Sequence, residues 1–425
     1  MITASIIKES AISQGIKTVA IGKKGSKPLE PQLIAEIIAE LQTQSIPPIQ
    51  QGAFFGALVI KGVTLEEKAL EKMLSPGALS NPYILVNSLA GDAPSAIKDY
   101  CIKILAAREL SRTQAEEMGD FLFSEMPGDG ARGIFSSILR VRYESADEYE
   151  GLLRSMQKTI VPSFRQPLAN GDPVIQIAEP FDGVDHSLMI TPLLADHLQK
   201  LNYRTVSLIG RNSGPKFYFN LLDLAEKIAV PIVSGNHEIK NDKPPFGYYI
   251  NQETLSPAID RWVELRRLMI KRPFLATLER FVNPVNAKIL IASAFHPPYG
   301  EKMLTIAERN HFPGAIIVRN GMEGTLAFAL KRAVKILCSA RQFDGTYKRF
   351  EFEFDSEKFL KENVALEERL ENPTVAENAE RILDYKKNNA SGNRLFDLRV
   401  RSTCKGIEQA VGWLENNIRA GKDPQ

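Results

Sequence analysis

Two short polar turns contain the residues best suited to bind an anion. The second turn follows the apolar run 205–209 and holds Gly210, Arg211, Asn212, Ser213 and Lys216. Glycine lets backbone N–H groups approach an anion closely, and guanidinium and ammonium groups bond to phosphate or carboxylate oxygens. These residues predict a site for a phosphate or a sugar phosphate. The same composition also suits a turn that only reverses the chain.

The first turn, 179–187, combines carboxylates with a histidine. Asp182, Asp185 and His186 could act in acid–base chemistry or bind a metal ion, and Asp182 with Gly183 could meet a phosphate. Because no second carboxylate pair stands nearby in the sequence, a hydrogen-bonded turn is the simpler interpretation.

A third group of charges lies in the segment 256–282. Trp262, Leu265 and Met269 would form an apolar stripe on a helix that turns about 100° per residue. Five cations surround this stripe: Arg261, Arg266, Arg267, Lys271 and Arg272. A helix that is basic around most of its girth could bind nucleic acid along its phosphate backbone, and an arginine fork also suits a carboxylate. A solvated helix with one ion pair explains the same residues without a ligand.

The elements that must position the two turns predict an α/β fold. The stretch 170–223 predicts strand, turn and helix twice in succession, which is typical of parallel sheets that bind ligands where their strands end. We expect Thr191 to cap the first of these helices. The predicted strands are 174–177, 205–209, 231–233, 288–292, 315–318 and 346–355. The predicted loop is 243–250, and helices are predicted at 217–229, 326–337, 376–385 and 405–421. The fold class is therefore α/β, with a mixed, largely parallel sheet beside a helical domain.

The N-terminal part predicts helices alone and contains an internal repeat. Residues 112–156 match 31–75 without gaps at an offset of 81, and a capping box recurs at Thr64–Glu67 and Ser145–Glu148. We expect two similar three-helix units in a helical domain at 1–165. The α/β domain is expected at 166–255 and 284–425, and 256–283 is expected to be a helical excursion that packs on the helical domain.

The composition excludes several classes of protein. With 53 basic and 51 acidic residues the formal charge is +2, so nucleic-acid binding would need a local basic patch. The three cysteines are far apart and predict neither a disulfide framework nor a metal site. The sequence has no signal peptide and no apolar run of about 18 residues, so we expect a cytoplasmic protein that does not enter a membrane.

The order of these parts resembles the anthranilate phosphoribosyltransferase family (glycosyl transferase family 3) from about residue 108 onward. The resemblance rests on the helices that begin LSRTQAEEM, on the paired turns, and on the segments RRLMIKRPFLATLERFVNP, VRNGMEG and ENPTVAENA. It implies a cleft between a helical and an α/β domain, a homodimer formed through the helices, and glycosyl or phosphoribosyl transfer. It also implies that Arg266 falls where the family binds its acceptor.

This chain departs from the family at three places. A glycine-rich run that cradles pyrophosphate is replaced here by Glu179-Pro180-Phe181-Asp182-Gly183, and the second turn has lost its lysine. The Asp-Glu pair that binds Mg²⁺ in the family falls at Leu326 and Ala327, which offer no oxygen ligands. The standard donor, Mg-phosphoribosyl pyrophosphate, is therefore doubtful. Mg²⁺ would be a cofactor only if transferase activity were retained, and no other cofactor is evident.

A branch of the family has further motifs in common with this chain. Phe181-Asp182-Gly183 followed by Ile190–Ala195, the run His296-Pro297-Pro298-Tyr299, and the turn Gly321–Gly324 are similar to motifs of non-catalytic homologues. Those homologues bind nucleic acid as dimers through basic helices. Two functions are therefore open: a glycosyl or phosphoribosyl transferase that binds a phosphorylated sugar, and a non-catalytic nucleic-acid-binding homodimer.

Overall fold

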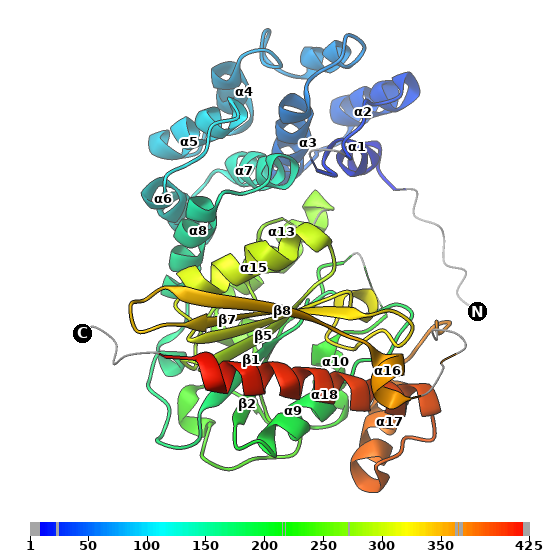
Figure 1. Ribbon diagram of the computed structural model, residues 1–425. Coiled ribbons are helices and arrows are strands. Elements are labelled where there is room, and N and C mark those ends of the chain that lie inside the picture. The colour runs from blue at the N-terminus through cyan, green and yellow to red at the C-terminus, as the bar shows by residue number, and fades with distance from the viewer. Residues whose placement is uncertain are drawn as a thin grey trace. The chain divides into compact units, whose positions relative to one another are not determined.

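The protein is described by a computed structural model that covers residues 9–22, 25–214, 216, 218–270, 273–361, 364 and 369–419. Its internal contacts divide the chain into two compact units (Figure 1). The first comprises Met1–Ser155 and Arg261–Leu275, and we call it the helical unit. The second comprises Met156–Asp260 and Ala276–Gln425, and we call it the sheet unit.

Within its described residues, the helical unit is built from helices. They are α1 (Ala11–Val19), α2 (Pro31–Thr43), α3 (Pro48–Lys61), the 3₁₀ helix η1 (Glu67–Met73), α4 (Pro82–Leu89), α5 (Ser95–Leu105), α6 (Arg112–Leu122), α7 (Asp129–Arg142), α8 (Ala146–Lys158) and α13 (Trp262–Met269). The last three residues of α8 belong to the sheet unit. Amphipathic spacing accounts for α2, which buries Ile34, Ile37 and Ile38.

The internal repeat predicted from the sequence is present in the structure. Helices α3 and α7 each have 14 residues and are offset by 81 at both ends. Both predicted capping boxes form, since Glu67 N donates to Thr64 Oγ1 and Glu148 N donates to Ser145 Oγ, each at 3.3 Å. The one difference is that the first box begins the 3₁₀ helix η1, whereas the second begins the α-helix α8.

The sheet unit contains one eight-stranded sheet in the order β3-β4-β2-β1-β5-β6-β7-β8. Its strands are β1 (Val174–Ala178), β2 (Arg204–Ile209), β3 (Ile232–Val233), β4 (Tyr248–Asn251), β5 (Ile289–Ala294), β6 (Gly314–Arg319), β7 (Val334–Arg341) and β8 (Tyr347–Phe354). Only the pairs β6–β7 and β7–β8 are antiparallel. The predicted fold class, α/β with a mixed and largely parallel sheet, is therefore confirmed.

Two local predictions in the sheet unit are wrong. The predicted loop 243–250 contains the start of β4. This strand pairs with β2 on one side and β3 on the other, and its residues Tyr248 and Tyr249 are buried. The predicted helix 326–337 is instead a buried apolar loop that leads into β7. There the alternating residues Val334, Ile336 and Cys338 belong to one core, so tertiary burial selects a strand.

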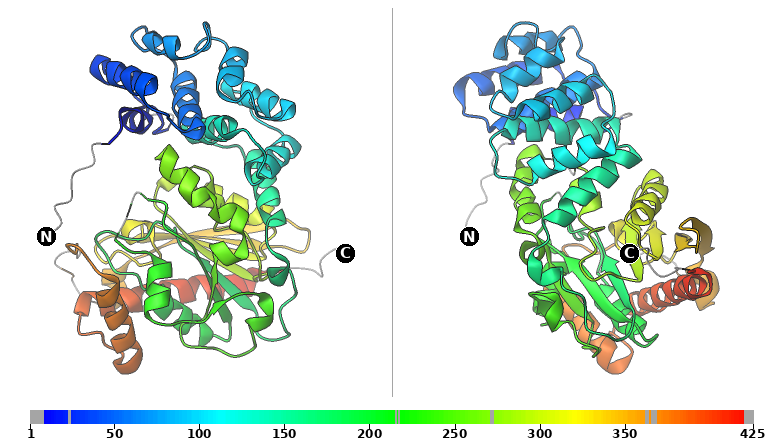
Figure 2. Two further views of the ribbon diagram at one scale, coloured as in Figure 1. Left: turned by 180° about the vertical axis from the view of Figure 1, so that it is seen from behind. Right: turned by 90° about the vertical axis from the view of Figure 1, so that its left-hand side faces the viewer.

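Helices cover both faces of the sheet. They and the short 3₁₀ turns of this unit are η2 (Pro162–Phe164), α9 (Thr191–Gln199), α10 (Leu221–Lys227), η3 (Asn236–Glu238), α11 (Gln252–Leu255), α12 (Pro257–Asp260), α14 (Leu275–Leu278), α15 (Pro297–Arg309), η4 (Met322–Gly324), α16 (Ser356–Leu360), α17 (Val375–Asn388) and α18 (Arg394–Asn417). Figure 1 shows α18 along one face and α15 on the other. The views of Figure 2 show the strands joined in one twisted sheet.

The first polar turn follows β1 and the second follows β2, its parallel neighbour. Parallel strands end at the same edge of a sheet, so this topology brings the two turns together. No helix in the described part of the chain is long and apolar enough to span a membrane.

Candidate phosphate-binding site

Asn220 clamps the two predicted turns to each other. Its side-chain amide donates to the carbonyl oxygens of Phe181 and Gly210, at 2.8 and 2.9 Å. Asn220 also caps α10, because its Oδ1 accepts from Leu222 N and Asp223 N. The predicted helix 217–229 therefore begins at Leu221.

An aromatic ring fills the space beside the second turn. The Phe181 side chain is buried, and a Cβ placed on Gly210 would lie 2.6 Å from its ring. Gly183 has φ of +71°, and a Cβ there would lie 2.1 Å from the carbonyl oxygen of Phe219. Both glycines are therefore required by close packing within the turns.

Glu179 is fully buried at the end of β1. Its Oε2 accepts from the Thr191 hydroxyl at 2.6 Å, and its Oε1 accepts from Leu326 N at 2.5 Å. Burial raises the pKa of Glu179 above its ordinary value, although these hydrogen bonds act in the opposite direction. The prediction that Thr191 caps α9 is wrong, since Ile190 stands at that position and the Thr191 hydroxyl is directed to Glu179 instead.

Arg211 forms a fork with a carboxylate of the same unit. Its Nε lies 3.1 Å from both oxygens of Asp260, and its Nη2 lies 2.7 Å from Oδ2. Arg211 keeps 35% of its side chain exposed, whereas Asp260 keeps 8%. The guanidinium therefore reaches the surface while its charge is balanced by a buried carboxylate.

Lys216 is bound to the first turn and to the turn Gly321–Gly324. Its ammonium donates to the carbonyl oxygens of Gly183 and Glu323, at 3.0 and 2.7 Å, and lies 3.5 Å from the Glu323 carboxylate. Asn212 closes the second turn from within, because its amide donates to the Lys216 carbonyl and its Oδ1 accepts from Gly214 N. The Ser213 residue of the same turn is half-buried.

Glu323 is the residue that the sequence reasoning missed. It accepts from Asp185 N, His186 N and the Ser187 hydroxyl, at 2.8 to 2.9 Å. Burial acts to raise the pKa of Glu323, but these hydrogen bonds and Lys216 hold it below its ordinary value. The signal in the sequence was the turn Gly321–Gly324 directly after a strand.

The first turn is a hydrogen-bonded turn around this carboxylate. Besides the contact of its backbone N–H with Glu323, His186 contacts the Leu370 carbonyl through Nδ1 and Arg369 through Nε2. Asp182 is buried, and its carbonyl accepts from the Asn212 amide at 3.4 Å. The predicted phosphate residues Asp182, Gly183 and Gly210–Ser213 therefore meet in one place, together with Lys216.

The residues at the expected metal position do not fit Mg²⁺. Leu326 and Ala327 are fully buried. Their backbone bonds go to Glu179 and Met322, and neither side chain has an oxygen atom. Among the residues that the structure describes, no three His, Cys, Asp or Glu side chains form a cluster that could hold a metal ion.

The predicted basic helix is wrong in its extent. Helix α13 ends at Met269, and Ile270 takes a left-handed conformation at its C-cap, so the helix is shorter than predicted. Lys271 and Arg272 lie outside the described part of the chain. Of the predicted apolar stripe, Trp262 and Met269 are buried and Leu265 is half-buried, while the buried face also takes in Val263 and Arg266.

The remaining cations of this segment contact the helical unit. Arg267 is exposed and lies 3.0 Å from Glu264 one turn earlier. Arg261 donates to the Ser124 carbonyl. Arg266 is buried within the helical unit, whereas the two turns belong to the sheet unit.

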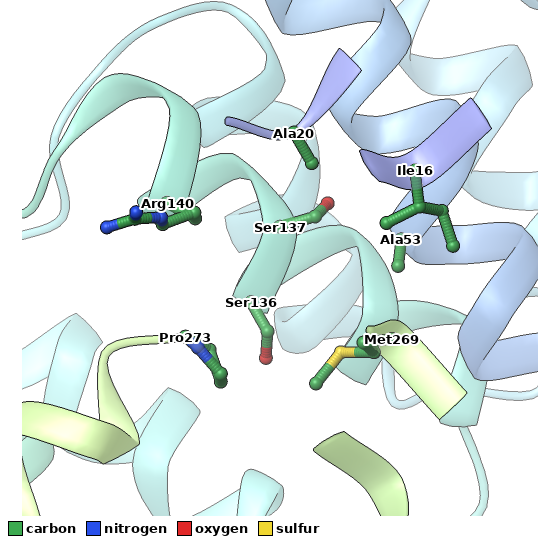
Figure 3. A pocket seen from close by; sticks show the side chains of 8 residues that line it. All are labelled: Ile16, Ala20, Ala53, Ser136, Ser137, Arg140, Met269 and Pro273. Atoms are coloured by element: carbon green, nitrogen blue, oxygen red, sulfur yellow. The ribbon is translucent and has the colours of Figure 1, made fainter. Parts of the chain in front are cut away.

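Two cavities lie away from these turns. In the helical unit, residues of α1, α3, α7 and the end of α13 line a cavity of about 10 Å³, and Figure 3 shows the Ser136 hydroxyl pointing into the space between Met269 and Pro273. That volume is too small for a phosphate. In the sheet unit, a pocket of about 420 Å³ lies where the strands begin, with the side chains of Asn236, Asn283 and Asn310 in its lining.

Comparison with known proteins identifies the fold of this chain. A scan against models of protein families found no match. An uncharacterised protein of Aquifex aeolicus strain VF5 is 20% identical over 217 residues, which cover 51% of this chain and 64% of that protein. The match thus spans less than two thirds of that relative.

Solved structures give the more extensive similarity. Anthranilate phosphoribosyltransferase from Thermus thermophilus matches with a TM-score of 0.58 at 17% identity, over 75% of this chain and 90% of that one. Anthranilate phosphoribosyltransferase from Saccharomyces cerevisiae in complex with PRPP and Mg matches with a TM-score of 0.54 at 13% identity, over 76% and 97%. This chain has the anthranilate phosphoribosyltransferase fold. The resemblance inferred from the motifs is therefore confirmed at the level of architecture.

Proposed function

We propose that this chain is a phosphoribosyltransferase-like binding protein. It recognises the phosphate group of a sugar phosphate or nucleotide at Arg211 and Ser213, beside the turns that Lys216 holds, and it does not transfer phosphoribosyl from Mg-phosphoribosyl pyrophosphate. The observation that carries the proposal is the pairing of Arg211 with Asp260 and of Lys216 with Glu323.

These two ion pairs limit the negative charge that a ligand can bring to the site. Two cations already face two carboxylates, so little positive potential remains for a pyrophosphate with several negative charges. Arg211 is nevertheless partly exposed, and Ser213 two residues further on is half-buried, so we expect one phosphate group to contact both side chains. The buried ring of Phe181 takes up the room beside Gly210 that a longer diphosphate would need.

Titration calorimetry with ribose 5-phosphate tests the binding half of the proposal. We expect binding that is unchanged by Mg²⁺ or by a chelator. Asp260→Asn removes the competing charge from Arg211 and is expected to tighten binding roughly tenfold, which corresponds to about 1.4 kcal/mol. Arg211→Met is expected to weaken it by a similar factor. Arg267→Ala, a surface change in the other unit, is the control and should have no effect.

The catalytic half is tested with anthranilate and phosphoribosyl pyrophosphate in the presence of Mg²⁺. We expect no product above the uncatalysed rate. Turnover, or binding of phosphoribosyl pyrophosphate that requires Mg²⁺, would overturn the proposal. If the wild type, Asp260→Asn and Arg211→Met bind ribose 5-phosphate with equal affinity, the phosphate-binding site does not lie at the second turn.

The nucleic-acid-binding homodimer remains the alternative proposal and has less support. Its basic helix ends before Lys271, buries Arg266 and pairs Arg267 with Glu264. Titration with single-stranded DNA at two salt concentrations decides it, because phosphate contacts make the affinity fall steeply with salt. A steep salt dependence that Arg267→Ala reduces would favour this alternative.

A further inference from the structure

The two sequence repeats pack against each other through α3 and α7, and the packing is reciprocal. A Cβ placed on Gly52 would lie 2.1 Å from the carbonyl oxygen of Gly130, and one placed on Gly133 would lie 2.0 Å from that of Ile49. Gly133 is the repeat counterpart of Gly52, and Gly130 is the counterpart of Ile49. The same contact therefore occurs twice with the roles of the two repeats exchanged.

The neighbouring contacts also occur twice, with the roles of the two repeats exchanged. The Cβ on Gly52 would next meet the nitrogen of Ile134, and the Cβ on Gly133 would meet that of Ala53, which is the counterpart of Ile134. A Cβ placed on Gly56 would lie 3.1 Å from the Ser137 hydroxyl oxygen, and Ser137 is the residue of the second repeat that corresponds to Gly56. A residue that touches its own equivalent is the mark of a twofold axis, as in an isologous interface between identical subunits.

Each repeat is also held together internally in the same way. The buried Glu67 pairs with Lys61 and accepts from Leu29 N, and the buried Glu148 pairs with Arg142 and accepts from Leu110 N. Lys61 and Arg142 each donate in addition to the carbonyl one residue further on. The two repeats are thus alike in structure as well as in sequence.

We propose that the first repeat serves as a built-in partner for the second. Residues 29–73 occupy, within one chain, the place that a second copy of residues 110–154 would take in a twofold dimer. The face of α7 that carries Gly133 and Ser137 is covered by α3 of the same chain, and no second chain binds there. The homodimer through the helices that the family resemblance implies is accordingly not formed on this face.

The proposal is independent of any ligand, and the state of the full-length chain tests it. Light scattering over a wide concentration range is combined with hydrogen–deuterium exchange of α3 and α7. We expect protection of both helices that does not change with concentration, whether light scattering gives the mass of one chain, 47.3 kDa, or of two. Protection of α7 that rises as the chain dimerises would overturn the proposal, whereas a dimer that leaves α3 and α7 unchanged uses another face and supports it.

Glycine variants test the reciprocity of the contact. Gly133→Ala and Gly52→Ala each force a methyl group against a backbone carbonyl, so limited proteolysis between α3 and α4 should accelerate roughly tenfold or more in both. Gly412→Ala is the matched control, because it also lies in a helix and a Cβ there meets nothing within 4 Å. An effect in one repeat without the other, or equal rates in all three variants, would refute a twofold pair.

Discussion

Replacing Glu148 with alanine is expected to lower the free energy of unfolding of the helical unit by about 3–5 kcal/mol. The carboxylate is completely buried, and it lies 2.6 Å from Arg142. It also accepts from Leu110 N at 3.0 Å and from Ser145 N at 2.9 Å. Its removal leaves a guanidinium that is 11% exposed without its counter-charge, and two backbone N–H groups without their acceptor.

The internal repeat supplies a second site for the same experiment. Glu67 lies 2.9 Å from Lys61, accepts from Leu29 N at 2.9 Å and from Thr64 N at 2.8 Å. Glu67→Ala should therefore cost a similar free energy. Glutamine at either position keeps one acceptor oxygen and the shape of the side chain, so the loss should fall to about 1–2 kcal/mol.

The two tryptophans allow the helical unit to be followed separately. Trp262 lies in the helical unit and Trp413 in the sheet unit. In a Trp413→Phe background, urea unfolding monitored by fluorescence reports on Trp262 alone. Losses below about 1 kcal/mol at either glutamate, or losses that differ between the two repeats by more than the typical error of extrapolation, would refute the reasoning.

Four further outcomes follow from single residues. The hydrogen bonds that lower the pKa of Glu323 stabilise the fold at neutral pH, and this contribution should be lost as the pH falls below about 4.3; Glu323→Gln should flatten the acid limb of a plot of thermal melting temperature against pH. Burial raises the pKa of Glu179, which gives the opposite sign: its contribution is present at low pH and is lost as the pH rises, so Glu179→Gln should leave the melting temperature unchanged or raised at neutral pH. The buried hydroxyl of Ser136 has no hydrogen-bond partner in the described part of the chain, so Ser136→Ala should stabilise by up to about 1 kcal/mol in denaturant titrations. Tyr143 has φ of +70° and ψ of +148° where its repeat counterpart is Gly62, so Tyr143→Gly should relieve about 1–2 kcal/mol of backbone strain in the same titrations, less whatever packing the ring provides.

Local patterns were sufficient to predict most of the elements in this chain. Strands β1, β2, β5, β6 and β8 were expected from apolar runs and from period-2 alternation, and their central residues are strands in the structure. The failures came where local composition misled. The prolines, glycine and tyrosines of 243–250 suggest a loop, yet β4 forms there because its backbone pairs on both sides with parallel strands.

For the candidate site, the sequence predicted the position of the two turns but not the partners of their cations. The sequence placed the two turns together, since both follow parallel strands. The partners of the cations come from distant segments: Asp260 for Arg211 and Glu323 for Lys216. No local pattern assigns such partners, because they depend on how the later part of the chain returns to the sheet.

The glycines of the turns do not themselves support phosphate binding. Gly183 is needed because of the Phe219 carbonyl and Gly210 because of the ring of Phe181, so both would be required in a protein with no ligand at all. The case for a phosphate therefore depends on the side chains of Arg211 and Ser213. Of these, the exposed side chain of Arg211 gives the most direct test, because Asp260→Asn removes its counter-charge while the glycines of the turns and the hydrogen bonds of Asn220 stay in place. If the wild type, Asp260→Asn and Arg211→Met bind ribose 5-phosphate equally, then the second turn reverses the chain and does nothing more.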